Sequence, residues 1–179
     1  MMPKPHLYFF LLLIFTTTAC FSDEDPLFTP AERRLPAITT EGLNTFGCYI
    51  DGELFGPLDS PGFAQDPIDA WYTPYSNGGF QLVCIQYNKE TKSRKVMNMI
   101  SNFTEVGNYG FSFIQESFTD FENSKRFAID TLSPNQIEIL HLNIEQAIVS
   151  GTFYFTAIAE DYSDTIKVTD GRFDVIVTY

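Results

Sequence analysis

The sequence predicts an all-β domain over residues 44–179, built as an antiparallel β-sandwich. From residue 44 onward, short apolar runs alternate with turn residues at spacings typical of antiparallel sheets. No long stretch has the periodicity of an amphipathic helix. A closed or partly open antiparallel barrel would produce the same pattern, so the sequence leaves that alternative open.

Residues 1–19 have the three parts of a secretory signal peptide. Lys4 supplies the positive charge, residues 7–14 form the apolar middle, and Ala19 is the small residue before cleavage. Cleavage there would make Cys20 the first residue of the exported chain, with its thiol lipidated by chains such as palmitate. Because the apolar run is shorter than the roughly 20 residues of a membrane span, we expect a lipid anchor.

Residues 20–43 have the composition of a flexible tether that starts at the lipidated cysteine, with prolines, charges and no sustained apolar period. A serine and three carboxylates follow the cysteine directly: Ser22, Asp23, Glu24 and Asp25. This cluster resembles the signal that carries lipoproteins to the outer face of the outer membrane in Bacteroidota. We therefore expect a lipid-anchored protein of the outer membrane that faces the cell exterior.

Within the domain, the first element is a hairpin around Asp51-Gly52, a dipeptide that favours tight two-residue turns. This turn would set Cys48 opposite Phe55 and Tyr49 opposite Leu54.

The segment from Leu58 to Gly79 is read as a long irregular connection, which is often functional in a compact domain. It carries Trp71, Tyr72 and Tyr75, which would contact a ligand by stacking on sugar rings or filling a partner's pocket. Alternatively, these aromatic side chains cap the core of the sheet.

Five strands are expected in the remaining apolar runs, near residues 80–88, 95–103, 109–116, 136–144 and 148–159. In the last of them Phe153 and Phe155 would face the core, and Thr152 and Tyr154 the opposite side.

A second Asp-Gly dipeptide, Asp170-Gly171, predicts a closing hairpin. Its register would place Val168 opposite Phe173 on one face and Lys167 opposite Asp174 on the other.

Cys48 and Cys84 are the thiols left in the exported chain once Cys20 carries lipid. A disulfide between them is one reading outside the reducing cytosol. Two buried, inert thiols are the other, because both cysteines lie in apolar runs.

The chain has a formal net charge of -12 and scattered basic residues, which argues against nucleic acid as a partner. A cation-rich partner, or solubility alone, fits this charge better.

No catalytic constellation, zinc-ligand spacing or cofactor motif is present, and His141 is the one histidine beyond the signal peptide. Two carboxylate pairs could serve glycoside hydrolysis across a cleft, namely Asp66 with Asp69 and Asp120 with Glu122. A turn with Glu160, Asp161 and Asp164 could offer oxygen ligands to calcium but lacks the ordered EF-hand pattern. We therefore predict no metal site and no cofactor.

Two blocks of sequence, LPAITTEGLNTFGC at residues 35–48 and VSGTFYFTA with VTDGRFDV near the end, resemble a family of Bacteroidota lipoproteins. No activity comes with this resemblance. Two Asp-Thr-apolar triplets, with threonines Thr131 and Thr165, resemble the sequence used for O-glycosylation of exported proteins in these bacteria.

The sequence therefore favours a surface-anchored binding or presentation module with a glycan or a protein as partner and no chemistry of its own. Two other functions stay open. A carbohydrate-acting hydrolase would need a cleft with two close acids, and a carrier of small apolar ligands would need an internal cavity lined by phenylalanines.

Overall fold

A computed structural model describes residues 34–58, 66–74, 79–111 and 116–179. These described residues contain strands and no helix, which confirms the all-β prediction. In chain order the strands are β1 (Thr45–Ile50), β2 (Glu53–Phe55), β3 (Ile68–Thr73), β4 (Gly79–Asn88), β5 (Ser93–Asn102), β6 (Gly107–Tyr109), β7 (Glu116–Asp120), β8 (Lys125–Ile129), β9 (Gln136–Asn143), β10 (Ile148–Ala159) and β11 (Thr165–Ile176).

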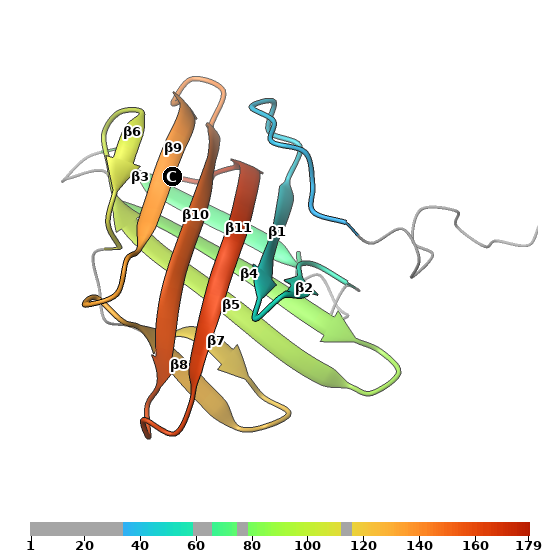
Figure 1. Cartoon of the computed structure of the whole chain (residues 1–179). Coiled ribbons are helices and arrows are strands. Elements are labelled where there is room, and N and C mark those ends of the chain that lie inside the picture. The colour runs from blue at the N-terminus through green and yellow to red at the C-terminus, as the bar shows by residue number, and fades with distance from the viewer. Residues whose placement is uncertain (1–33, 59–65, 75–78, 112–115) are drawn as a thin grey trace, which may run out of the picture. The chain divides into compact units, whose positions relative to one another are not determined.

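The strands form one antiparallel sheet that does not close, in the order β2-β1-β11-β10-β8-β7-β5-β4-β3. β9 pairs with the first half of β10 and carries β6 on its other edge. In Figure 1, β9, β10, β11 and β1 lie in one layer, and β3, β4 and β5 cross behind it. This arrangement fits a β-sandwich or a partly open barrel, the two open architectures that the sequence predicted.

Aromatic rings fill the space between the layers. Phe80 on β4 stacks on Phe173 on β11 with ring centroids 5.6 Å apart, and Phe46 stacks on Phe153 at 5.5 Å. The alternation predicted for β10 is confirmed, because Phe153 and Phe155 are buried while Tyr154 is exposed. Burial of such large apolar surfaces is the main stabilising contribution to the domain.

Two glycines of the β10–β11 pair lie beneath phenylalanine rings. Gly151 pairs with Phe173, and Gly171 pairs with Phe153. A Cβ atom on Gly171 would lie 2.5 Å from the Phe153 ring, and one on Gly151 would lie 2.2 Å from the Glu138 carbonyl oxygen. Because glycine has no side chain, an aromatic ring from the neighbouring strand can lie directly against the backbone at both positions.

The Asp51-Gly52 turn forms the predicted hairpin, with Cys48 opposite Phe55 and Tyr49 opposite Leu54. Asp51 and Gly52 both have positive φ, at 50° and 85°. A two-residue turn of this type needs that conformation at both positions, and the Asp-Gly dipeptide supplies it.

The hairpin predicted at Asp170-Gly171 is wrong. Both residues lie inside the single strand β11, where Val168 faces Phe155 of β10 and the register shifts before Gly171. Asp170 has a φ of 53°, so this dipeptide again supplies the left-handed conformation. Here that conformation forms a β-bulge, an extra residue in β11 relative to both neighbouring strands.

The segment expected to be an irregular connection contains β3, which pairs with β4 from Ile68 opposite Cys84 to Thr73 opposite Gly79. On its other edge, the Tyr72 amide donates to the Thr178 carbonyl and the Thr178 amide donates to the Ala70 carbonyl, both at 2.9 Å. The C-terminal residues thus cover part of an edge that would otherwise expose unpaired backbone groups.

Four of the other expected strands are present as β4, β5, β9 and β10, with bounds within a few residues of those predicted. Of the strand predicted at 109–116, residues 110 and 111 lie outside the strands, and residues 112–115 lie outside the described part of the chain; β6 ends at Tyr109 and β7 begins at Glu116. The strand β8, with Phe127 and Ile129 facing the core, was missed.

The domain also begins earlier than residue 44, because the end of the expected tether is bound to β11. We call residues 36–43 the strap. The Asp174 carboxylate accepts hydrogen bonds from the Thr39 hydroxyl at 2.7 Å and from three strap amides, the shortest being that of Gly42 at 2.8 Å. The Arg172 guanidinium donates to the Pro36 carbonyl at 3.0 Å. Residues 34–179 accordingly form one compact unit.

Candidate functional site

A cleft of about 620 Å³ lies where the β1–β2 turn, the β7–β8 turn and the β10–β11 turn come together beside β4 and β5. We call it the end cleft. It combines an apolar lining with charged and amide side chains: Ile50, Asp51, Glu53, Leu54, Phe55, Gln86, Lys95, Phe118, Asp120, Asn123, Lys125, Phe127, Asp164 and Ile166. Its volume is in the range typical of ligand sites.

The apolar lining of the end cleft belongs to the core. Phe55, Phe118, Phe127 and Ile166 are all buried. Phe118 contacts Phe55 edge to face, with centroids 5.6 Å apart, and Phe127 at 5.9 Å. These contacts hold the rings in place, so this part of the cleft is preformed.

Asp120 is the last residue of β7, and several donor groups surround its carboxylate. It accepts hydrogen bonds from the amides of Glu122 and Asn123 and from the Asn123 side chain at 2.9 Å, and Lys95 Nζ lies 3.7 Å away. Burial raises the pKa of the Asp120 carboxyl, but these hydrogen bonds and the Lys95 charge outweigh it and leave the pKa below its usual value. Asp120 therefore stays ionised and fixes the β7–β8 turn.

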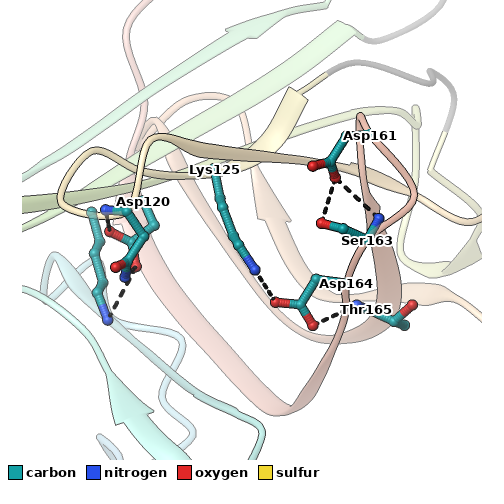
Figure 2. Close-up of polar contacts among 8 residues, drawn as sticks. Asp120, Lys125, Asp161, Ser163, Asp164 and Thr165 are labelled. Atoms are coloured by element: carbon teal, nitrogen blue, oxygen red, sulfur yellow. Dashed lines mark hydrogen bonds and ion pairs between the residues drawn. The ribbon is translucent and has the colours of Figure 1, made fainter.

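On the other side of the end cleft, Lys125 of β8 forms an ion pair with Asp164 (Figure 2). The hydrogen bond to Asp164 is the main cause that raises the pKa of Lys125, and the same bond lowers the pKa of Asp164. Both side chains are exposed, so water screens the pair and its contribution to stability is small. Its effect is to place two charges at the mouth of the cleft.

The end cleft has an excess of negative charge. Its lining holds four carboxylates, from Asp51, Glu53, Asp120 and Asp164, against the ammonium groups of Lys95 and Lys125. Lys95 lies against Asp120 and Lys125 binds Asp164. The carboxylates of Asp51 and Glu53 therefore have no ion pair with either lysine of the lining. The Asp51 carboxylate accepts the Lys167 amide at 2.8 Å, and Glu53 is exposed on β2. The field of this site thus favours positively charged groups.

The predicted aromatic contact residues do not form one surface. Trp71 is 40% exposed on β3, whereas Tyr72 is 2% exposed and donates from its hydroxyl to the Phe103 carbonyl at 3.0 Å. Successive side chains of a strand point to opposite faces, which separates these two neighbours. The proposed ligand contact by Tyr72 is therefore wrong. Tyr75 lies outside the described residues.

Cys48 and Cys84 are both fully buried and are free thiols in the structure. Burial raises the pKa of each thiol, and the charge of Cys48 raises that of Cys84 further. Both groups are thus held in the neutral, unreactive form.

Of the carboxylate pairs considered for hydrolysis, Asp120 accepts a hydrogen bond from the Glu122 amide, and both Asp66 and Asp69 are exposed to solvent. In the β10–β11 turn, Asp161 binds Ser163 (Figure 2) and Asp164 binds Lys125.

No group of metal-ligating side chains is found among the described residues.

The two threonines considered for O-glycosylation, Thr131 and Thr165, are both exposed. Cys20 and the export cluster at residues 22–25 lie outside the described part of the chain. No helix in that part is long and apolar enough to span a membrane.

Sequence reasoning missed the end cleft, although it identified the Asp51-Gly52 turn and the acidic β10–β11 turn that border it. The cleft exists because three turns far apart in the chain meet at one end of the sheet. A partial signal is the run Thr119-Asp120-Phe121-Glu122-Asn123, because aspartate and asparagine at this spacing favour a capped turn.

Residues 83–176 match the model of a family described as Domain of unknown function (DUF6252). No curated protein and no solved structure is similar enough to the chain to count as a match.

Proposed function

Since the chain belongs to the DUF6252 family, whose function is not known, we propose from its own geometry that it is a non-enzymatic binding module that holds a basic ligand in the end cleft. The single observation that carries this proposal is the cleft itself, with its buried phenylalanines and its excess of carboxylates.

A ligand that fits this chemistry has apolar side chains next to Lys or Arg. The apolar groups would contact the partly exposed Ile50 and Leu54, and the cations would meet Asp51 and Glu53. The net charge of -12 would also steer a cationic partner toward the domain over longer distances. A protein segment with alternating basic and apolar residues is the simplest ligand of this kind.

Charge reversal at Glu53 tests this proposal. We expect Glu53→Lys to weaken binding of a synthetic Lys- and Leu-containing peptide about fivefold, because one attraction becomes a repulsion at a partly screened site. Isothermal titration calorimetry measures the affinity. The matched control is Glu145→Lys, which makes the same charge change at an exposed position of the β9–β10 turn, away from the cleft lining.

An equal loss of affinity in both variants would show that net charge alone attracts the peptide. No measurable binding of the peptide to the wild-type chain, or binding of a Glu- and Leu-containing peptide with the same affinity, would contradict a basic ligand.

We further propose that this module is a lipoprotein of the outer membrane, tethered through Cys20 and exposed on the cell surface. The support is the signal-peptide pattern of residues 1–19, the acidic cluster after Cys20 and the resemblance to Bacteroidota lipoproteins. Metabolic labelling with palmitate should mark the wild-type chain and leave Cys20→Ala unlabelled. Protease shaving of intact cells should then remove the domain, and survival until the outer membrane is broken would place it in the periplasm.

A further inference from the structure

A second hollow of about 270 Å³ lies on the face of β9, β10 and β11 that is turned away from the core. We call it the outer groove, and it shares no residue with the end cleft. We propose that the outer groove binds a neutral sugar residue of a glycan chain, with Tyr154 as the ring on which the sugar stacks.

The polar side chains of the outer groove form two rows across three strands. In one row Glu138, Thr152 and Arg172 stand directly opposite one another on β9, β10 and β11. In the next row Tyr154 faces Gln136 on one side and the bulge at Asp170 on the other.

These side chains match the two kinds of surface on a sugar. Tyr154 is 41% exposed and Ile38 of the strap is 54% exposed, so both offer apolar contact to the C–H face of a ring. The carboxylates, the amide and the guanidinium around them are planar groups that donate or accept paired hydrogen bonds with neighbouring hydroxyls.

The groove is also held in shape before any ligand binds. The Tyr154 hydroxyl donates to Gln136 Oε1 at 3.4 Å, and Gln136 Nε2 donates to Asn108 Oδ1 at 2.6 Å. Thr152 Oγ1 donates to Glu138 Oε2 at 3.4 Å. Such a network reduces the loss of side-chain freedom when a ligand binds.

The bulge in β11 is a further indication of a binding site. Asp170 has a φ of 53°, a conformation that costs free energy for a residue other than glycine. The bulge places Asp170 in the lining of the groove, and bulges often redirect a side chain toward a functional site.

The charges of the groove disfavour an anionic ligand. Glu138 and Asp170 outnumber Arg172, so a phosphate or sulfate group would be repelled. The volume is slightly below the range of drug-sized ligand sites and suits one sugar residue rather than a folded partner.

The test uses the full chain and hexasaccharides of glucose, galactose and mannose, with binding followed by calorimetry. We expect at least one of them to bind, Tyr154→Ala to lower its affinity about tenfold, and Tyr154→Phe to keep the affinity within about twofold. The control is Tyr162→Ala, which removes an 85% exposed tyrosine from the β10–β11 turn and should leave affinity unchanged. The melting temperature of each variant is measured to exclude unfolding.

Absence of binding to all three sugars would overturn the proposal, and so would binding that Tyr154→Ala leaves intact. Glu53→Lys should not alter sugar binding, so the outer groove and the end cleft are tested separately.

Discussion

A Gly151→Ala variant is expected to lose about 3–5 kcal/mol of unfolding free energy, a large part of the stability of an ordinary domain. The added Cβ would lie 2.2 Å from the Glu138 carbonyl oxygen on β9 and 2.8 Å from the ring of Phe173 on β11. The carbonyl is part of the sheet backbone, so it cannot move aside without breaking strand pairing. Urea denaturation followed by tryptophan fluorescence measures the loss.

The matched control is Gly79→Ala at the start of β4. Among the residues that the structure describes, its Cβ would meet only the Asn102 side chain, at an ordinary distance of 3.8 Å, and we expect a change within about 0.5 kcal/mol. A Gly151→Ala protein as stable as the control would contradict the close approach of β9, β10 and β11.

An Asp174→Asn variant is expected to lose about 2–4 kcal/mol at pH 7. The Asp174 carboxylate is 1% exposed and receives four hydrogen bonds from the strap. An asparagine amide would point a donor at other donors and leave strap amides unpaired. The comparison variant Asp69→Asn changes an exposed carboxylate on β3 in the same way and should cost less than about 0.5 kcal/mol.

The Asp174 contribution should also depend on pH. Burial raises the pKa of this carboxyl, but the hydrogen bonds from Thr39 and the strap amides outweigh it, so the folded pKa is below the usual value. The carboxylate therefore stabilises the fold above the unfolded pKa of about 3.9, and this stability disappears as pH falls through the folded pKa. Denaturation at pH 7 and pH 3 should show the difference between wild type and Asp174→Asn shrinking in acid. A gap of constant size would contradict this account.

The two Asp-Gly dipeptides show how far local sequence determines this fold. Both supply a residue with positive φ, Asp51 in a turn and Asp170 in a bulge. The dipeptide specifies the backbone conformation, but the neighbouring strands decide whether the chain reverses. At Asp170 both β1 and β10 pair on either side of the bulge, and their long-range contacts keep β11 one continuous strand through it.

Burial patterns were predictable where one strand faces the core along its whole length, as in β10 with Phe153 and Phe155. Burial patterns were not predictable where the local sequence signals conflicted with long-range pairing. The prolines around β3 indicated a loop, yet Tyr72 is a core residue because β4 and the C-terminal residues pair with β3 on both edges. Likewise, Pro36 and the charges before residue 44 indicated a tether, but Arg172 and Asp174, far away in the chain, bind that segment.

The most direct test of the central claim is a map of backbone amide NMR shifts as the Lys- and Leu-containing peptide is added. The account predicts that shifts concentrate on residues that line the end cleft, from Asp51 to Phe55, from Phe118 to Phe127 and near Asp164. Shifts centred instead on the exposed face around Trp71, or spread evenly over the acidic surface, would contradict the end cleft as the binding site.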